Sequence, residues 1–173
     1  VSDVRWLVVP RHPQRFDEVA VLASRAGFSV SRRSAWGVDG PDDAEVWIGD
    51  TLGEMPLYYG MADVALLGGS FLPLGGQNLI EAAACGCPIV MGPHTFNFAD
   101  ASTRAQAAGA ALRVQAIEDG VREAAALACD RERHAAVAAR AVAFASAHRG
   151  AAASTAEAVL TLLPALHGVH APR

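Results

Sequence analysis

A loop bounded by two glycine pairs is the part of the sequence best suited to chemistry. It begins Gly68-Gly69-Ser70, ends Gly75-Gly76-Gln77-Asn78, and leads from an apolar segment into a predicted helix. Glycine lets backbone N–H groups approach a phosphate closely, and the first turn of a helix adds unpaired donors and partial positive charge. The candidate phosphate-binding residues are therefore Gly69, Ser70, Gly75, Gly76, Gln77 and Asn78.

Glu81 follows Asn78 by one helical turn, close enough for its carboxylate to accept both hydroxyls of a ribose. Each such charged hydrogen bond contributes about 1.5–3 kcal/mol. The same spacing of Asn78 and Glu81 is typical of a helix capping box, and paired glycines also form ordinary tight turns. Nucleotide binding is favoured because the glycine pairs, the preceding apolar segment and the glutamate occur together.

A second candidate loop carries Arg11 and His12 between Pro10 and Pro13, with Arg15 just beyond. Two arginines and a histidine at this place can clamp a phosphate or an acidic sugar. The alternative is that these are solvated charges, and Arg15 can simply begin the next helix.

Two further loops supply weaker candidates. Asp50 and Thr51 follow an apolar segment and are expected to border the base, while Pro93 and Asn97 are expected to reach the sugar. Ordinary helix capping is the alternative, because Asp50 or Thr51 precedes Glu54 and Asn97 precedes a predicted helix.

Short apolar segments alternate with predicted helices along the chain. The predicted strands are Trp6–Val9, Phe28–Ser31, Val46–Ile48, Val64–Leu67, Pro88–Met91 and Ala111–Val114. The predicted helices are Arg15–Arg25, Glu54–Gly60, Asn78–Cys85, Asn97–Ala108 and an Ala-rich stretch that continues to about Leu163. Continuously apolar strands belong to a parallel sheet covered on both faces. The pattern predicts a doubly wound, Rossmann-like α/β domain with one sheet of about six strands, whose ligands bind where the strands end.

We expect residues 1–150 to form this domain and residues 151–173 to form a C-terminal helix and tail. The chain opens at Val1, without an initiator Met, and directly enters a strand pattern. This beginning suggests a piece of a longer protein.

The composition argues against several classes of function. With 52% hydrophobic residues among 173, the chain can form one folded core. The net charge is -4 and the Arg32-Arg33 pair is isolated, so no basic patch indicates nucleic-acid binding. The three cysteines fit neither a disulfide framework nor a zinc site and suit a reducing cytosol. No segment approaches the about 20 apolar residues that span a bilayer, so we expect a soluble domain with no metal or cofactor.

Six motifs, in order, resemble the C-terminal half of 3-deoxy-D-manno-octulosonic acid (Kdo) transferases. They span about Val8 to Val114, and their order and spacing are more specific than any one of them. The motifs are Val9–Phe16 (VPRHPQRF), Arg32–Ser34 (RRS), Gly49–Glu54 (GDTLGE), Gly68–Ser70 (GGS), Gly75–Glu81 (GGQNLIE) and Gly92–Phe98 (GPHTFNF).

The resemblance implies an inverting, metal-independent transferase of the two-domain GT-B architecture. Such an enzyme moves Kdo from CMP-Kdo onto a lipid A precursor at the cytoplasmic face of the inner membrane. By resemblance, Gly76 and Asn78 face the donor phosphate and Glu81 faces the ribose. The general base, the acceptor site and the membrane contacts belong to the N-terminal half of the family. We therefore expect no catalytic residue in this chain, weak nucleotide binding and no turnover.

The chain departs from the family pattern at two positions. The family usually has His where this chain has Gln77, and Pro where it has Leu79. Gln can donate a neutral hydrogen bond but cannot become a cation or exchange a proton near neutral pH.

Three other functions share some of these features. Another GT-B transferase or a UDP-sugar epimerase has the same strand, glycine loop and helix glutamate. A non-catalytic interaction module could use the apolar Ala-rich C-terminal helices as a docking surface. The expected last helix, Ala152–Leu163, packs on the other domain in GT-B enzymes and could expose an apolar face in this chain. A dinucleotide-binding oxidoreductase is disfavoured because the first loop lacks the Gly-x-Gly-x-x-Gly pattern.

Overall fold

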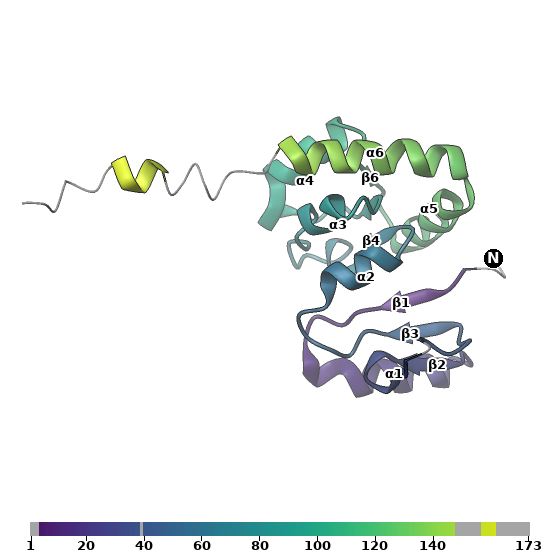
Figure 1. The fold of residues 1–173 in the computed structure, drawn as a ribbon. Helices are drawn as coiled ribbons and strands as arrows, with labels where there is room; N and C mark the ends of the chain where they lie inside the picture. Colours follow the sequence, from purple (N-terminus) through teal and green to yellow (C-terminus); the bar gives the residue numbers. More distant parts are fainter. Residues whose placement is uncertain (1–3, 39, 148–156, 162–173) are drawn as a thin grey trace, which may run out of the picture.

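The computed structural model describes residues 4–38, 40–147 and 157–161 of the chain (Figure 1). Its strands are β1 (Trp6–Val8), β2 (Val30–Arg32), β3 (Val46–Ile48), β4 (Ala65–Leu67), β5 (Ile89–Met91) and β6 (Ala111–Arg113). Its α-helices are α1 (Phe16–Arg25), α2 (Met55–Met61), α3 (Ile80–Ala84), α4 (Ala99–Ala107), α5 (Ile117–Cys129) and α6 (Arg131–Ala147). Single 3₁₀ turns lie at Pro13–Arg15, Arg33–Ala35, Gly68–Ser70 and Phe96–Phe98. The predicted alternation of strands and helices is confirmed.

The strands form two parallel sheets of three strands each, in the orders β1-β3-β2 and β4-β5-β6. The prediction of one sheet of six strands is therefore wrong, although β1 lies between β3 and β4 in the ribbon (Figure 1). The reason lies in the packing. The buried core cluster includes residues of β4, β5 and β6 but none of β1, β2 or β3. No shared core therefore holds β1 and β4 at the spacing of about 4.8 Å that a ladder requires.

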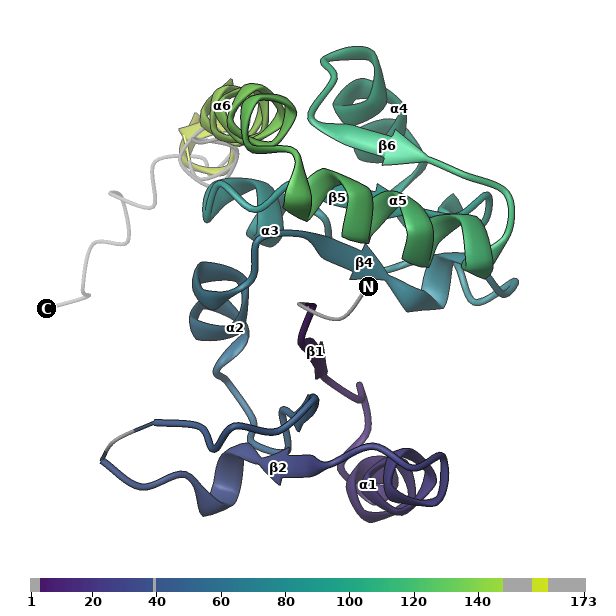
Figure 2. The same ribbon diagram turned by 90° about the vertical axis from the view of Figure 1, so that its right-hand side faces the viewer.

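The core surrounds the second sheet. All three residues of β5 are fully buried, as expected for a continuously apolar central strand. Helix α5 packs on β4 and β5, and α6 packs against α3 and α5 (Figure 2). Both helices contribute alanines to the buried core cluster, including Ala83 of α3 and Ala141 of α6, and such small side chains let helices approach closely. This half of the molecule positions the loops that follow β4 and β5.

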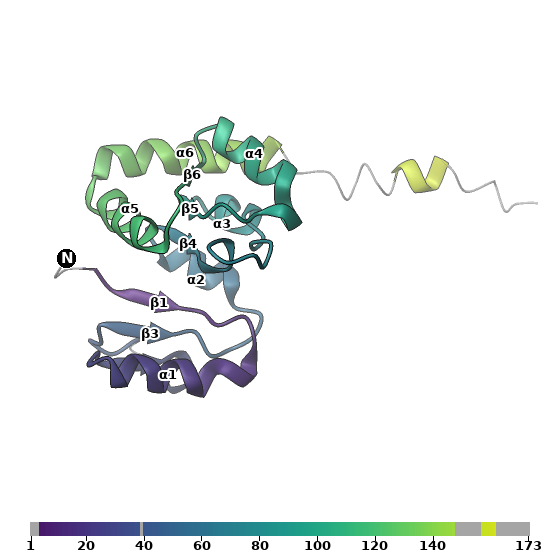
Figure 3. The ribbon, with the colours of Figure 1, turned by 180° about the vertical axis from the view of Figure 1, so that it is seen from behind.

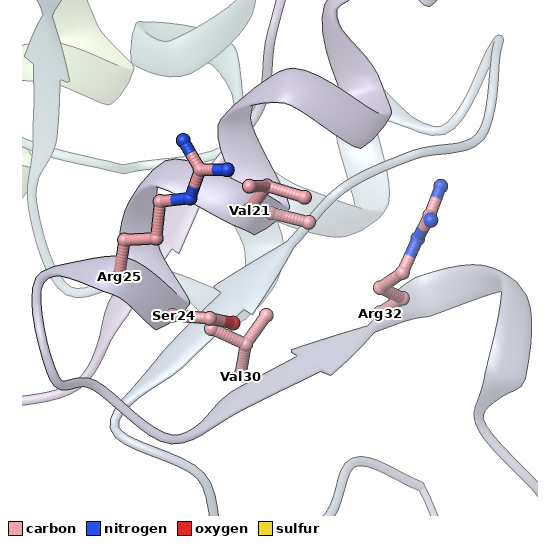
Figure 4. A pocket seen from close by; sticks show the side chains of 6 residues that line it. Val21, Ser24, Arg25, Val30 and Arg32 are labelled. Atoms are coloured by element: carbon pink, nitrogen blue, oxygen red, sulfur yellow. The ribbon is translucent and has the colours of Figure 1, made fainter.

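The first sheet is more open. Helix α1 packs against β2 and β3, yet it has no buried residue, and Val21 is 47% exposed. An open pocket lies between α1 and β2 (Figure 4). Its lining residues are Ala20, Val21, Ser24, Arg25, Val30 and Arg32. None of these is a predicted site residue.

The Ala-rich C-terminal stretch forms two helices rather than one, because the helix is interrupted at Asp130. The Asp130 backbone is extended, and its carboxylate accepts a hydrogen bond from the Arg133 N–H at 3.0 Å. Asp130 thus caps α6. Its side chain accepts a backbone hydrogen bond at the start of α6, and this favours a helix end over a continuous helix, which the Ala-rich composition did not reveal. Most of the expected helix Ala152–Leu163, and of the tail 151–173, lies outside the described residues. Residues 157–161 are helical and exposed.

None of the helices that the structure describes is long and apolar enough to cross a membrane. The described residues also contain no group of three or more His, Cys, Asp or Glu side chains that could hold a metal ion. All three cysteines are free thiols, and burial raises the pKa of Cys87 to about 12.

Candidate functional site

The loop after β4 and the loop after β5 are hydrogen-bonded to each other at both ends. At the strand end, the His94 N–H donates to the Ser70 carbonyl oxygen at 2.9 Å. At the far end, Asn97 donates its backbone N–H to Gly75 O at 3.1 Å and its side-chain amide to Leu74 O at 3.2 Å. Residues 68–78 and 92–98 therefore form one interlocked unit, which we call the paired loops.

Glycine is required where the paired loops touch. Gly75 and Gly76 have φ angles of 86° and 80°, a region that L side chains rarely adopt. A Cβ at Gly75 would lie 2.2 Å from the Asn97 side-chain nitrogen. The glycine pair predicted for a phosphate loop thus also permits the close approach of residues 92–98.

Five consecutive backbone N–H groups lie in the loop just before α3. Among the described residues, no acceptor is found for the N–H groups of residues 75–79. Nearly all buried backbone donors in proteins have partners. A run of unpaired N–H groups where a strand leads into a helix is an arrangement suited to an anion.

Ser70 is buried and has two hydrogen bonds of its own. Its hydroxyl donates to Leu67 O at 2.5 Å and accepts from the Gly92 N–H at 2.7 Å. Its side chain is 0% exposed, so it joins the paired loops instead of facing solvent. The sequence could not distinguish these roles, because the partner Gly92 is 22 positions away.

Gln77 closes over the start of the loop. Its side-chain oxygen accepts a hydrogen bond from the Gly69 N–H at 3.1 Å. A Cβ at Gly69 would lie 3.2 Å from the Gln77 amide, so the two residues are in close contact. Two of the predicted phosphate-binding residues are therefore brought together directly.

Asn78 and Glu81 also contact each other. The Asn78 side-chain nitrogen donates to the Glu81 carboxylate at 2.9 Å, and its oxygen accepts from the Ile80 N–H at 3.1 Å. Helix α3 begins at Ile80, two residues later than predicted, so Asn78 stabilises the turn before the helix. Glu81 is exposed, and its carboxylate is held next to the loop by Asn78.

Arg113, at the end of β6, supports the paired loops and was not predicted. Its guanidinium donates to Gly92 O at 2.8 Å, to Pro93 O at 3.3 Å and to Thr95 Oγ1 at 3.1 Å. No motif or periodicity marked it, because an arginine that closes an apolar strand usually faces solvent.

Asp50 stabilises the first sheet. Its carboxylate, only 2% exposed, accepts from Arg32 Nε at 2.7 Å and from the Ser34 N–H and hydroxyl at 2.8 and 2.6 Å. Burial alone would raise the pKa of Asp50, but the hydrogen bonds from Ser34 and Arg32 outweigh it and lower the pKa. The partners of this carboxylate therefore lie in β2 and in the turn that follows it.

Thr51 belongs to a second polar cluster. Its hydroxyl contacts the Glu54 carboxylate and the Tyr58 hydroxyl, and Arg33 pairs with Glu54 at 2.8 Å. The hydrogen bond from Thr51 is the main reason that the pKa of Glu54 is lowered. Thr51 and Glu54, which the sequence suggested as a capping pair, thus form a side-chain network at the start of α2.

Arg11 and His12 are exposed, and neither side chain has a hydrogen-bond or ion-pair partner in the described part of the chain. Arg15 differs, because it pairs with Glu18 on α1 at 3.1 Å. Arg15 therefore begins the helix, while Arg11 and His12 are free to meet a ligand.

The structure places the candidates in two groups. The loops after β1, β3 and β4 all lie at the same end of the molecule, seen from the front and from behind (Figures 1 and 3). Within the described ranges, no hydrogen bond joins residues 10–15 or 49–54 to the paired loops. The candidate site with the most internal contacts consists of the paired loops and Glu81, with the first-sheet loops at the same end.

Known proteins give a consistent assignment, although no family model matches the chain. The 3-deoxy-D-manno-octulosonic acid transferase of Bordetella pertussis is 50% identical over 153 residues, which are 88% of this chain and 36% of that protein. The transferase of Haemophilus influenzae is 44% identical over 92 residues, 53% of this chain and 21% of that protein.

One solved structure is matched over a larger share of its own chain than these two relatives are. The C-terminal CMP-Kdo binding domain of WaaA from Acinetobacter baumannii matches with a TM-score of 0.75 and 31% identity, over 83% of this chain and 75% of that one. The resemblance seen in the motifs is thereby confirmed. The chain spans about a third of the Bordetella relative, and it belongs to the Kdo transferase family, where it corresponds to the C-terminal domain.

Proposed function

We propose that this chain is the part of a Kdo transferase that binds the donor, CMP-Kdo. The observation that carries the proposal is the run of unpaired N–H groups at residues 75–79, followed by the exposed carboxylate of Glu81. A phosphate on these donors leaves the ribose within reach of Glu81. The Acinetobacter domain, described as CMP-Kdo binding, supports the choice of nucleotide.

The roles of the remaining residues follow from their surroundings. Arg11, exposed and unpaired, supplies positive charge for the carboxylate that makes Kdo an acidic sugar, and His12 beside it supplies a hydrogen-bonding ring nitrogen. Asn97 and Ser70 keep the paired loops docked, so the N–H groups are held in place before the ligand arrives. Donors that are fixed in advance bind charge without the cost of reorganisation.

In the whole protein, we propose transfer of Kdo to a lipid A precursor with inversion, in a two-domain GT-B enzyme at the cytoplasmic face of the inner membrane. The acceptor hydroxyl oxygen forms a bond to the anomeric carbon of Kdo as the bond to CMP breaks. The N–H groups of residues 75–79 stabilise the charge that develops on the departing phosphate. The acceptor proton passes to a base outside this chain.

Calorimetric titration with CMP and, separately, with UDP tests the donor assignment. We expect CMP to bind more tightly than UDP, and Glu81→Ala to weaken CMP binding by roughly 10- to 100-fold, since charged hydrogen bonds are lost. Glu132→Ala is the matched control, because Glu132 is an exposed glutamate in the first turn of α6 and far in sequence from the loops.

Each outcome has a defined meaning. A preference for UDP would overturn CMP-Kdo as the donor of this chain. Equal weakening by Glu81→Ala and Glu132→Ala would exclude Glu81 from the site. A turnover assay with CMP-Kdo and acceptor should give no product from this chain alone, and product would contradict the placement of the base elsewhere.

A further inference from the structure

Arg113 reaches from β6 to the loop after the neighbouring strand, β5. Three of its hydrogen bonds go to that loop, at Gly92 O, Pro93 O and Thr95 Oγ1. We propose that Arg113 is a positioning residue for nucleotide binding, which holds residues 92–98 in the shape that fixes Gly75 and Gly76. The proposal rests on the proposed function of the paired loops.

The geometry uses the whole guanidinium. One terminal nitrogen donates to Gly92 O at 2.8 Å and Pro93 O at 3.3 Å, and the other donates to Thr95 Oγ1 at 3.1 Å. The Nε–H donates to Gln106 Oε1 at 2.9 Å, an exposed contact that lies outside the loop. A rigid planar fork can hold three loop atoms at once, whereas a lysine ammonium is a single point of attachment.

A buried relay extends the anchor into α4. Because Thr95 accepts from Arg113, its hydroxyl can donate to Ser102 Oγ at 2.8 Å, and Ser102 donates to Ala99 O at 3.0 Å. Thr95 and Ser102 are 8% and 1% exposed, so these bonds form away from solvent. Arg113 and α4 together fix the middle of the loop.

The loop transmits this position to the glycines. Asn97 donates to Gly75 O and Leu74 O, and a Cβ at Gly76 would lie 3.3 Å from His94 O and Thr95 Cα. Because Asn97 is hydrogen-bonded to Gly75 O and Leu74 O, a movement of residues 92–98 displaces the backbone of Gly75 and of its neighbour Gly76. Arg113 has no hydrogen bond to residues 68–78 within the described structure, so it acts through the loop.

The charge of Arg113 adds a second effect. The four oxygen atoms that accept its hydrogen bonds are all neutral, and in the described part of the chain no carboxylate pairs with it. A half-buried cation without a counter-ion favours an anion bound nearby. Lysine retains this charge but not the fork, and methionine retains neither, so the two effects can be separated.

The test combines amide NMR spectra of the labelled chain without ligand, thermal unfolding and calorimetric titration with CMP. Arg113→Met should shift the amide resonances of Gly75, Gly76 and Asn97 and weaken CMP binding by roughly 3- to 30-fold. Arg113→Lys should shift the same resonances and weaken binding less, because the charge remains.

Two controls separate positioning from general stability. Gln106→Ala removes the Nε acceptor outside the loop, so it should lower the melting temperature while leaving the Gly75 and Gly76 resonances in place. Arg104→Met removes an exposed arginine that pairs with Asp100 on α4. It should change neither the melting temperature nor the Gly75 and Gly76 resonances.

The proposal is overturned if Arg113→Met leaves the Gly75 and Gly76 resonances where the Arg104→Met control has them, or if CMP binding is unchanged. If the wild-type chain binds no CMP, the proposed function fails, and the resonances of the ligand-free chain still decide whether Arg113 positions the glycines. If Arg113→Met does not fold, the same resonances measured in Arg113→Lys decide whether the fork is required.

Discussion

The backbone N–H of Asn97 donates to the carbonyl oxygen of Gly75 at 3.1 Å, while the Asn97 side chain fills the place where a Cβ of residue 75 would lie. Two residues from different predicted motifs are thus in direct contact. The contact joins the loops after β4 and β5 into one unit. Glycine at 75 therefore serves the docking of the loops as well as the approach of a phosphate.

Gly75→Ala should destabilise the chain and weaken CMP binding. The new methyl group would collide with Asn97, and the φ of 86° is strained for alanine. We expect a loss of about 1–3 kcal/mol in the free energy of unfolding. Urea denaturation and CMP titration measure the two effects.

Gly60→Ala is the matched control. Gly60 lies within α2, and a Cβ there would meet no atom within 4 Å. Alanine should stabilise the helix by about 0.5–1 kcal/mol and leave CMP binding unchanged. A Gly75→Ala chain as stable as wild type would show that the loops separate easily.

Asp50→Asn should lower stability at neutral pH and flatten its dependence on acid pH. The pKa of Asp50 is lower in the folded chain than its ordinary value, so its carboxylate contributes stability above the unfolded pKa of about 3.9. This contribution is lost as the pH falls through the folded pKa. At pH 7 we expect a loss of about 1–3 kcal/mol, because buried hydrogen bonds lose their acceptor charge.

Urea unfolding at pH 7, 4 and 3 measures this difference, which should shrink toward pH 3. Asp63→Asn is the control, since Asp63 is exposed and its carboxylate has no hydrogen bond or ion pair in the part of the chain described. A gap between wild type and Asp50→Asn that stays constant with pH would contradict the role of the Asp50 charge.

Gln77→His should make CMP binding more dependent on pH than it is in the wild-type chain. An imidazole beside Gly69 becomes a cation below its pKa of about 6.5 and then attracts phosphate. The ratio of variant to wild-type affinity should rise by roughly 3- to 10-fold from pH 8 to pH 5.5. Dividing by the wild-type value removes the titration of CMP itself, and a ratio that does not change would place residue 77 away from the phosphate.

Local patterns in the sequence were enough to predict the strands and most helices. Val46–Ile48 is β3 as predicted, and α1 begins one residue after its predicted start. These elements depend on apolar segments and turn residues that are neighbours in sequence. The same local reasoning found the glycine pairs, Asn78 and Glu81, which lie in one short stretch of chain.

Tertiary structure decided what sequence neighbours do not control. Ser70 is hydrogen-bonded to Gly92 from 22 positions away, Asp50 is bonded to Arg32 from 18 positions away, and Arg113 is bonded to Gly92 across 21 positions. The division into two sheets likewise depends on which helices bury which strands. Residue type and spacing therefore determined which loops could carry a nucleotide site. Long-range hydrogen bonds and packing determined which side chains remain available to a ligand and which hold the loops in place, because those contacts form only when distant segments meet.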